Sequence, residues 1–167
     1  EGYDMLGLIC GSEGLLGVIT EVTVKILKKP QTVKAALIGF PTHEDGGNCV
    51  SEIIANGIVP AGMEIMDKAL IEATDNFSKA GYPRDAELLL IVEMDGTISE
   101  VDELINKVSE NSKKNNSSTI KISKNEKERL SFWIGRKAAF PACGAMAPDY
   151  YCMDGSIPRR KLAEALK

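Results

Sequence analysis

Residues 88–94 read L-L-L-I-V-E-M, and residues 95–108 continue D-G-T-I-S-E-V-D-E-L-I-N-K-V. The apolar run has the length of a strand and does not alternate with polar residues, which is typical of a strand buried on both faces. Thr97 and Glu100 have the spacing of a capping box, which opens a helix. Apolar residues then recur at helical spacing from Val101 to Val108. The stretch therefore predicts a buried strand that turns directly into an amphipathic helix.

Outward from this unit, strand and helix patterns alternate along the chain. Further strands are expected at residues 35–40 and 62–66 and around Ile120 and Ile122, with an extended segment at 149–154; helices are expected to begin at Thr42, Asp67, Asn125 and Pro158. From residue 35 onward the order is β-α-β-α-β-α-β-α. An α+β fold, a ferredoxin-like antiparallel sheet with helices on one face, is the economical packing of this order. A parallel doubly wound sheet is the alternative.

Composition and charge limit the class of protein. The chain has 167 residues, 44% of them hydrophobic, and a formal net charge of −4. These values are close to the globular average, which argues against a disordered or fibrous chain. The acidic balance argues against a broad nucleic-acid surface, because phosphate binding needs clustered Lys and Arg. No apolar run approaches the roughly 20 residues that a membrane-spanning helix needs.

Histidine and cysteine usage gives no sign of a metal centre. His43 is the only histidine, so a site with two histidine ligands cannot form within the chain, and no metal site is expected. The four cysteines contain no C-x-x-C pair; they are Cys10, Cys49, Cys143 and Cys152. Scattered cysteines of this kind are expected to be small buried apolar residues in a reducing compartment.

A glycine cluster near the start is the sharpest candidate for chemistry. Residues 11–20 read G-S-E-G-L-L-G-V-I-T, and residues 22–26 alternate in the pattern of a half-buried strand that Pro30 ends. The cluster is not a Walker loop, because the Gly-Lys-Ser/Thr ending is missing, and it precedes a strand where a Rossmann turn precedes a helix. The residues alone leave two interpretations open: a tight turn into a strand, and a backbone cradle for a cofactor.

Three long stretches carry a resemblance to a known family. They are G-Y-D-M-L-G-L-I-C-G-S-E-G-L-L-G-V-I-T-E-V-T-V-K-I-L-K-K-P at residues 2–30, A-L-I-G-F-P-T with G-I-V-P-A-G-M-E-I-M-D-K at 36–42 and 57–68, and F-W-I-G-R-K-A-A-F-P-A-C-G-A-M-A-P-D-Y-Y-C-M-D-G-S-I-P-R-R-K-L at 132–162. Together they resemble the FAD-linked D-2-hydroxyacid oxidases and dehydrogenases among the vanillyl-alcohol-oxidase-type flavoproteins. Within that family the resemblance is greatest to the branch of glycolate oxidase D subunits.

The resemblance implies two domains and an FAD site. Residues 1–30 would form the C-terminal edge, with the last strand region, of an FAD-binding domain. Residues 31–167 would form the C-terminal cap or substrate domain, which is ferredoxin-like and truncated here. In the family the glycine loop and the following strand line the flavin; the corresponding cofactor-binding residues are Gly11, Ser12, Glu13, Gly14, Gly17, Val18 and Ile19.

The resemblance also implies a reaction: oxidation of a small D-2-hydroxy acid, glycolate or D-lactate, to the 2-oxo acid by hydride transfer to FAD. Such chemistry needs a cation that holds the carboxylate and a base for the hydroxyl proton. Arg136 matches the family's carboxylate-binding arginine, and Tyr150 and Tyr151 are expected to lie near the substrate. No catalytic residue is assigned to this chain, because the family's histidine-rich segment that supplies the base is not found in it.

Further expectations concern the state of the chain. It begins with Glu1 and lacks the family's pyrophosphate-binding half, so we expect a fragment that is inactive and does not retain FAD. The parent is expected to be cytoplasmic, peripheral to the inner membrane through other oxidase subunits or an electron-transfer partner. Two alternatives are weighed: a non-catalytic ferredoxin-like module that binds a partner, and an aryl-alcohol or sugar-lactone oxidase, against which the D-Y-Y-C-M-D-G-S-I-P stretch argues.

Overall fold

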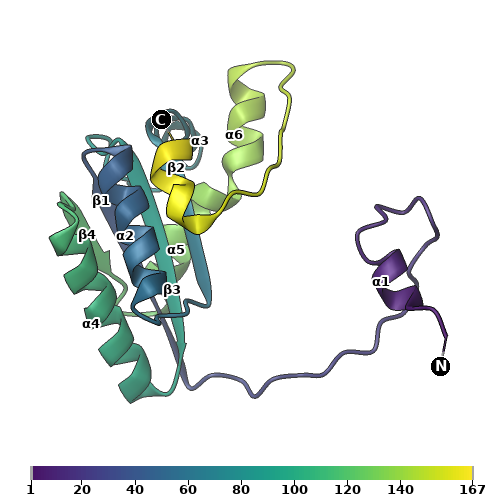
Figure 1. Ribbon diagram of the computed structural model, residues 1–167. Coiled ribbons are helices and arrows are strands. Elements are labelled where there is room, and N and C mark those ends of the chain that lie inside the picture. The colour runs from purple at the N-terminus through teal and green to yellow at the C-terminus, as the bar shows by residue number, and fades with distance from the viewer. Residues whose placement is uncertain (1, 167) are drawn as a thin grey trace.

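The computed structural model describes residues 2–166; Glu1 and Lys167, the outer ends of the two expected domains, lie outside the described residues. Its elements, labelled in Figure 1, are α1 (Met5–Ile9), β1 (Thr32–Phe40), α2 (His43–Ala55), β2 (Gly62–Asp67), α3 (Lys68–Ser78), β3 (Leu88–Gly96), α4 (Ile98–Lys114), β4 (Thr119–Ile122), α5 (Glu126–Lys137), α6 (Ala139–Met146), the 3-10 turn η1 (Arg159–Lys161) and α7 (Leu162–Ala165).

The four strands form one sheet in the order β2-β3-β1-β4, and every neighbouring pair is antiparallel. The expected α+β antiparallel sheet is therefore confirmed, and the parallel alternative is wrong. The two central strands pair along their full length, with Thr32 opposite Gly96 and Phe40 opposite Leu88. The short strand expected around Ile120 lies at one edge as β4, where it pairs with β1 alone.

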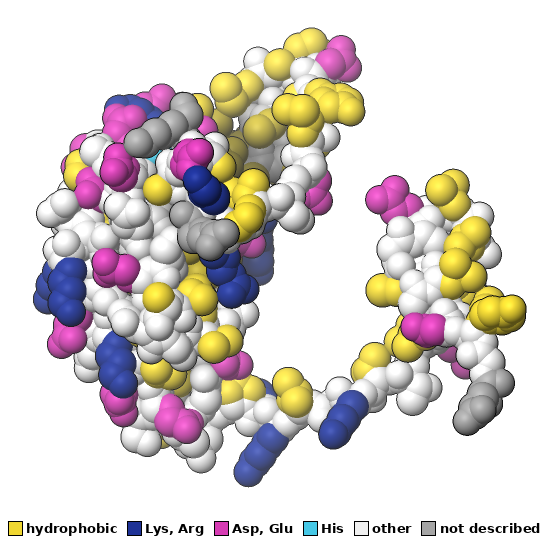
Figure 2. Space-filling view, viewed as in Figure 1, with side chains coloured by type: hydrophobic (Ala, Val, Ile, Leu, Met, Phe, Trp, Pro, Cys, Tyr) yellow, Lys and Arg dark blue, Asp and Glu magenta, His cyan; other side chains and the backbone are white. Residues whose placement is uncertain are grey.

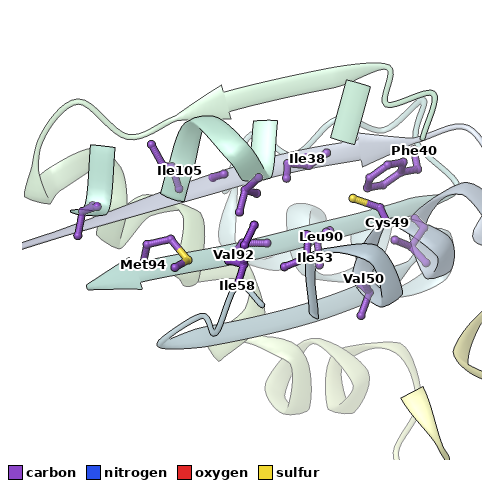
Figure 3. Close-up of a cluster of buried hydrophobic side chains, with 14 residues drawn as sticks. Ile38, Phe40, Cys49, Val50, Ile53, Ile58, Leu90, Val92, Met94 and Ile105 are labelled. Carbon is purple, nitrogen blue, oxygen red and sulfur yellow. The ribbon is translucent and has the colours of Figure 1, made fainter. Parts of the chain in front are cut away.

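Both faces of the sheet are covered by helices, so the fold has more helical cover than the expected single layer. On one face, alternate residues of β1 and β3 pack with α2 and α4 around Phe40, Ile53, Val92 and Val101 (Figure 3). On the other face, Leu37, Leu89 and Ile91 pack with Ile71 of α3 and with Trp133 of α5. A strand buried on both faces needs apolar residues at consecutive positions, which explains the unbroken run in β3.

Side-chain caps set where the main helices begin. The Oγ1 of Thr42 accepts from the backbone N–H of Asp45 at 3.0 Å, and Oδ1 of Asp67 accepts from that of Leu70 at 2.9 Å. Thr97 and Glu100 form the predicted capping box, and Asn125 caps α5. Each such cap stabilises its helix by about 1 kcal/mol. Four of the five predicted helix starts are thus confirmed, whereas Pro158 precedes the 3-10 turn η1.

The N-terminal segment differs from its prediction. The strand expected at residues 22–26 does not form: residues 18–30 have no strand ladder, and Val22, Val24 and Ile26 are exposed. Figure 1 shows the segment leaving the sheet as an extended arm that ends in α1. A half-buried strand needs a neighbouring strand and an apolar surface beneath it, and the described part of the chain places neither beside these residues.

The C-terminal part contains a helix that the sequence patterns did not reveal. Helix α6 follows α5 directly after Ala138 and packs beside α3. Its Pro141 lies in the first turn, where a missing N–H breaks no helical bond. The segment expected at 149–154 is extended but has no strand partner, and η1 with α7 then returns the chain to α2. Among the described helices, not one combines the length and the apolar character needed to cross a bilayer.

Candidate functional site

A cavity of about 720 Å³ lies between the end of β2, helices α3, α5 and α6, and the extended segment after α6. All three residues expected at the substrate line it: Arg136, Tyr150 and Tyr151. They come from two segments that are separated by all of α6, and the chain reverses after α6 so that the following segment runs back beside it (Figure 1). The structure thereby gathers the predicted substrate residues around one space.

Arg136 is held on one side and open on the other. Its Nε donates to Oε2 of Glu64 at 3.0 Å, and Glu64 lines the same cavity from β2. Among the described residues, the two terminal nitrogens of Arg136 have no hydrogen-bond partner. About a third of the side chain is exposed. A guanidinium with both terminal N–H groups available has the planar fork that binds a carboxylate by two parallel hydrogen bonds.

The backbone that carries Arg136 rests on Tyr82. The Tyr82 hydroxyl donates to the carbonyl oxygen of Phe132 at 2.6 Å and accepts from the backbone N–H of Arg136 at 3.1 Å. Gly135 makes this approach possible, since a Cβ built there would lie 2.3 Å from Cε2 of Tyr82. Burial is the main reason that the pKa of the Tyr82 hydroxyl is raised, so it stays a neutral donor.

The outer wall of the cavity is aromatic and accessible. Tyr150 lies beside Phe140 with ring centroids 6.5 Å apart, a spacing within the favourable range for aromatic pairs. Tyr151 and Met153 continue this wall and are more than 80% exposed. Figure 2 shows hydrophobic side chains gathered at the top of the molecule, where Figure 1 places α6 and the segment that follows it.

Sequence patterns missed the role of Glu64. Glu64 and Asp67 suggest a carboxylate pair, but a strand residue and a helix cap explain them better. The structure confirms Asp67 as the cap of α3, although both residues also line the cavity. The contact of Glu64 with Arg136 joins positions 72 residues apart. The one available signal is a charged residue flanked by the apolar Met63 and Ile65.

The predicted cofactor residues also share one surface. A groove of about 460 Å³ is lined by all seven of them: Gly11, Ser12, Glu13, Gly14, Gly17, Val18 and Ile19. Gly11 and Gly14 have φ values of +83° and +82°, a region that favours glycine, and a Cβ on either would meet no atom within 4 Å. Bare glycine backbone beside exposed Val18 and Ile19 fits one face of a flat, partly apolar ring system with polar edges.

Only one of the four free cysteines is fully buried, which corrects the expectation for the others. Cys49 lies in the core, where burial raises the pKa of its thiol to about 11. Cys10 and Cys152 are exposed; Cys10 lies in the glycine groove, and Cys143 and Cys152 line the arginine cavity. His43, the lone histidine, is the first residue of α2 and lines neither space.

The fold is shared with a class of known enzymes. Two solved structures of alkyldihydroxyacetonephosphate synthase superpose on 83–85% of this chain and 29–30% of their own, with a TM-score of 0.58 and 19–20% identity. Residues 29–167 match the model of a family described as "FAD linked oxidases, C-terminal domain". The chain belongs to this family of FAD-linked oxidase C-terminal domains.

Curated relatives align with nearly the whole chain. It is 49% identical over 166 residues to glycolate oxidase subunit GlcD of Escherichia coli K12, and 31% identical to that subunit of Bacillus subtilis. It is 34% identical to the mitochondrial D-lactate dehydrogenase [cytochrome] of Arabidopsis thaliana. Each alignment covers 99% of this chain and 29–35% of the relative. The chain therefore spans about a third of the length of the curated relatives it matches.

Proposed function

We propose that this chain is part of an FAD-dependent oxidoreductase that oxidises a small D-2-hydroxy acid, glycolate or D-lactate, to the 2-oxo acid. The observation that carries the proposal is Arg136 in its cavity: one guanidinium with both terminal nitrogens available, in a chain of the FAD-linked oxidase family. The relatives named as glycolate oxidase subunits and D-lactate dehydrogenases support the choice of acid.

In this proposal the residues of the cavity bind and orient the acid. The terminal N–H groups of Arg136 donate to the two carboxylate oxygens, which fixes the acid at one end. Tyr150 and Tyr151 form the side wall of the cavity beside that ion pair. We assign no proton-abstracting base to this chain, because the acidic side chains of the cavity, Glu64 and Asp67, are engaged with Arg136 and the α3 cap.

The glycine groove is proposed to hold part of the flavin. Backbone groups of Gly11, Ser12, Glu13 and Gly14 would border its polar edge, and Gly17, Val18 and Ile19 would contact its flat surface. FAD, when bound, supplies the acceptor for the hydride that leaves the 2-carbon of the acid. Residues 1–30 would accordingly belong to an FAD-binding domain, and residues 31–167 to the substrate domain.

Partners and location follow the same relatives. Two of them are named as subunits of glycolate oxidase, so we propose that the parent works in a multi-subunit oxidase or with an electron-transfer partner. We place it in the cytoplasm, peripheral to the inner membrane through those subunits.

The test uses the protein expressed from its complete gene. Purified protein is assayed for FAD by absorbance and for turnover with glycolate, D-lactate and L-lactate, with an artificial dye as electron acceptor. Bound FAD and reduction of the dye by glycolate or D-lactate, but not by L-lactate, are the expected results. A colourless protein that turns over none of the acids would contradict the proposal and favour the non-catalytic partner-binding module.

A further inference from the structure

The charges around the arginine cavity are unbalanced toward the negative. Of the described residues that line it, one side chain is cationic, Arg136, and two are carboxylates, Glu64 and Asp67. The Asp67 carboxylate accepts from the backbone at the start of α3, and the Glu64 carboxylate accepts from Arg136. The cavity thus offers one guanidinium edge to a bound carboxylate and, among the described residues that line it, has no second cation for another.

Glu64 also restricts the geometry of Arg136. Its Oε2 accepts from Nε at 3.0 Å, which leaves the edge formed by the two terminal nitrogens for a ligand. The backbone N–H of Arg136 is held separately by the Tyr82 hydroxyl. A guanidinium tethered at both its backbone and its Nε loses little freedom when a carboxylate binds, and such pre-organisation improves affinity.

From these contacts we propose that Glu64 is a positioning and specificity-determining residue. It aims the guanidinium of Arg136, and its negative charge limits the site to 2-hydroxy acids that carry a single carboxylate. The proposal rests on the proposed function, in which Arg136 binds the substrate carboxylate. A second carboxylate on the acid would meet Glu64 and Asp67 without a cation of its own, and like charges at such range repel in a partly desolvated cavity.

Matched pairs of acids measure this selectivity. Tartronate is glycolate with one added carboxylate, and D-malate bears the same relation to D-lactate. In the protein expressed from its complete gene, we expect kcat/KM for each monocarboxylate to exceed that of its partner by about tenfold or more, as one unfavourable charge contact would produce.

Two variants separate the charge of Glu64 from its hydrogen bond. Glu64→Gln keeps an oxygen that accepts from Nε but removes the charge, so the preference for glycolate over tartronate should fall about tenfold. Glu64→Ala removes both, so the KM for glycolate should also rise by about tenfold because the guanidinium is no longer aimed.

Glu87→Gln is the matched control, because Glu87 forms an ion pair with Lys68 of similar exposure outside the cavity. It should leave both the KM values and the selectivity unchanged. A Glu64→Gln variant that retains the wild-type preference would overturn the proposal, and so would a Glu64→Ala variant with an unchanged KM for glycolate.

A binding measurement keeps this proposal distinct from the proposed function. Titration calorimetry gives the Kd of glycolate and of tartronate for the wild type and for Glu64→Gln. One outcome is that no acid is turned over but glycolate binds about tenfold more tightly than tartronate, and Glu64→Gln removes that difference. This outcome would support the role of Glu64 and contradict the proposed oxidase activity. If neither acid binds, both are overturned.

Discussion

Arg136 is a partly exposed cation whose side chain is committed at one nitrogen only. Its Nε is bound to Glu64, and its terminal nitrogens face no protein acceptor among the described residues. We predict that Arg136→Ala in the protein expressed from its complete gene lowers kcat/KM for glycolate by about 10²-fold or more, as loss of a charge-assisted bond to the substrate does. Steady-state kinetics with a dye acceptor measure it.

Lys137 provides the control for this prediction, because it is a cation on the same helix that is exposed and lies outside the cavity. Lys137→Ala should keep kcat/KM within about twofold of the wild type, the usual range for a surface change. Equal losses in the two variants would assign the effect to helix α5 and not to the guanidinium.

Gly14 tests the proposed flavin groove at the scale of one residue. Its φ of +82° is strained for any branched side chain, and its position borders the groove. Gly14→Val should abolish retention of FAD, measured as the loss of flavin absorbance in purified protein. Gly57→Val carries the same strain at φ +75° in the turn after α2, and that variant should keep its flavin. Normal flavin content in Gly14→Val would contradict the assignment.

Arg136 could be identified from the sequence, whereas Glu64 could be identified only from the structure. The local motif around residues 132–137 singles out Arg136 through its resemblance to the family, and the three expected substrate residues do meet in one cavity. Glu64 could not be identified in this way. Its contact with Arg136 depends on where β2 stands in the sheet and on how α5 crosses it, and neither is encoded in the few residues around position 64.

At the scale of elements, Asp75 organises the loop between α3 and β3. Its Oδ1 accepts from the backbone N–H groups of Gly81 and Tyr82 at 2.7 and 3.2 Å, and its Oδ2 accepts from Nε of Arg84 at 2.8 Å. Burial alone would raise the pKa of this carboxyl, but the bonds from Arg84 and the backbone outweigh it and lower the pKa below its ordinary value. The loop that presents Tyr82 to α5 therefore depends on an ionised Asp75.

A pH dependence follows from that lowered pKa. The stabilisation from Asp75 is complete above the unfolded pKa of about 4 and is lost as the pH falls through the lower folded pKa. At pH 7, Asp75→Asn should lower the free energy of unfolding in urea by about 2 kcal/mol. The difference in unfolding free energy from the wild type should become smaller in acid below pH ~4. Asp149→Asn, at an exposed position, should change little; a gap that stays constant with pH would refute the ionic role.

Gly135 controls how closely α5 approaches the loop. Because a Cβ there would lie 2.3 Å from the Tyr82 ring, Gly135→Ala should destabilise the chain by about 2 kcal/mol through overpacking. Gly144→Ala in α6 is the control, since the nearest atom to a Cβ built there lies 3.9 Å away. The double variant Tyr82→Ala, Gly135→Ala should show a smaller loss than the sum of the single variants in urea unfolding. Strict additivity would mean that the two residues do not clash.

The elements that could be predicted are those with local signals. Caps at Thr42, Asp67, Thr97 and Asn125 mark the helix starts because a capping bond spans three residues. Helix α6 lacks such a cap, and its mostly small apolar residues give no amphipathic period. The strand expected at residues 22–26 has the right alternation, but alternation describes a surface to be covered and does not supply the covering sheet.

At the scale of the whole molecule, Figure 1 shows the N-terminal arm (residues 2–30) and the sheet domain (residues 31–166) as two separate parts. The arm carries the glycine groove and many exposed apolar side chains (Figure 2). Leu15, Val18 and Val24 are among these exposed residues. Within the described residues the groove is bordered by the arm alone. We predict that the isolated 167-residue chain shows no stoichiometric binding when titrated with FAD and monitored by flavin fluorescence.

The protein expressed from its complete gene is the positive control for that titration. Saturation of the isolated chain at one FAD per chain would show that the glycine loop is sufficient to bind FAD. It would contradict the expectation that binding also needs the family's pyrophosphate-binding half. The alternation of strands and helices from β1 to α5 was predictable from local patterns, but the placement of helices on the second face of the sheet was not. The placement of the arm could not be predicted either, because its own residues do not specify the surface against which it packs.

The outer wall of the arginine cavity belongs to a segment outside every strand and helix of the sheet domain. Tyr150, Tyr151 and Met153 are at least half exposed, and no buried residue of either core cluster comes from that segment. Substitutions there change the size of the cavity while leaving the folding core untouched. Under the proposed function, substitutions at these three positions would change which acid is accepted almost independently of stability, and the three positions would be the starting library for engineering a new substrate range.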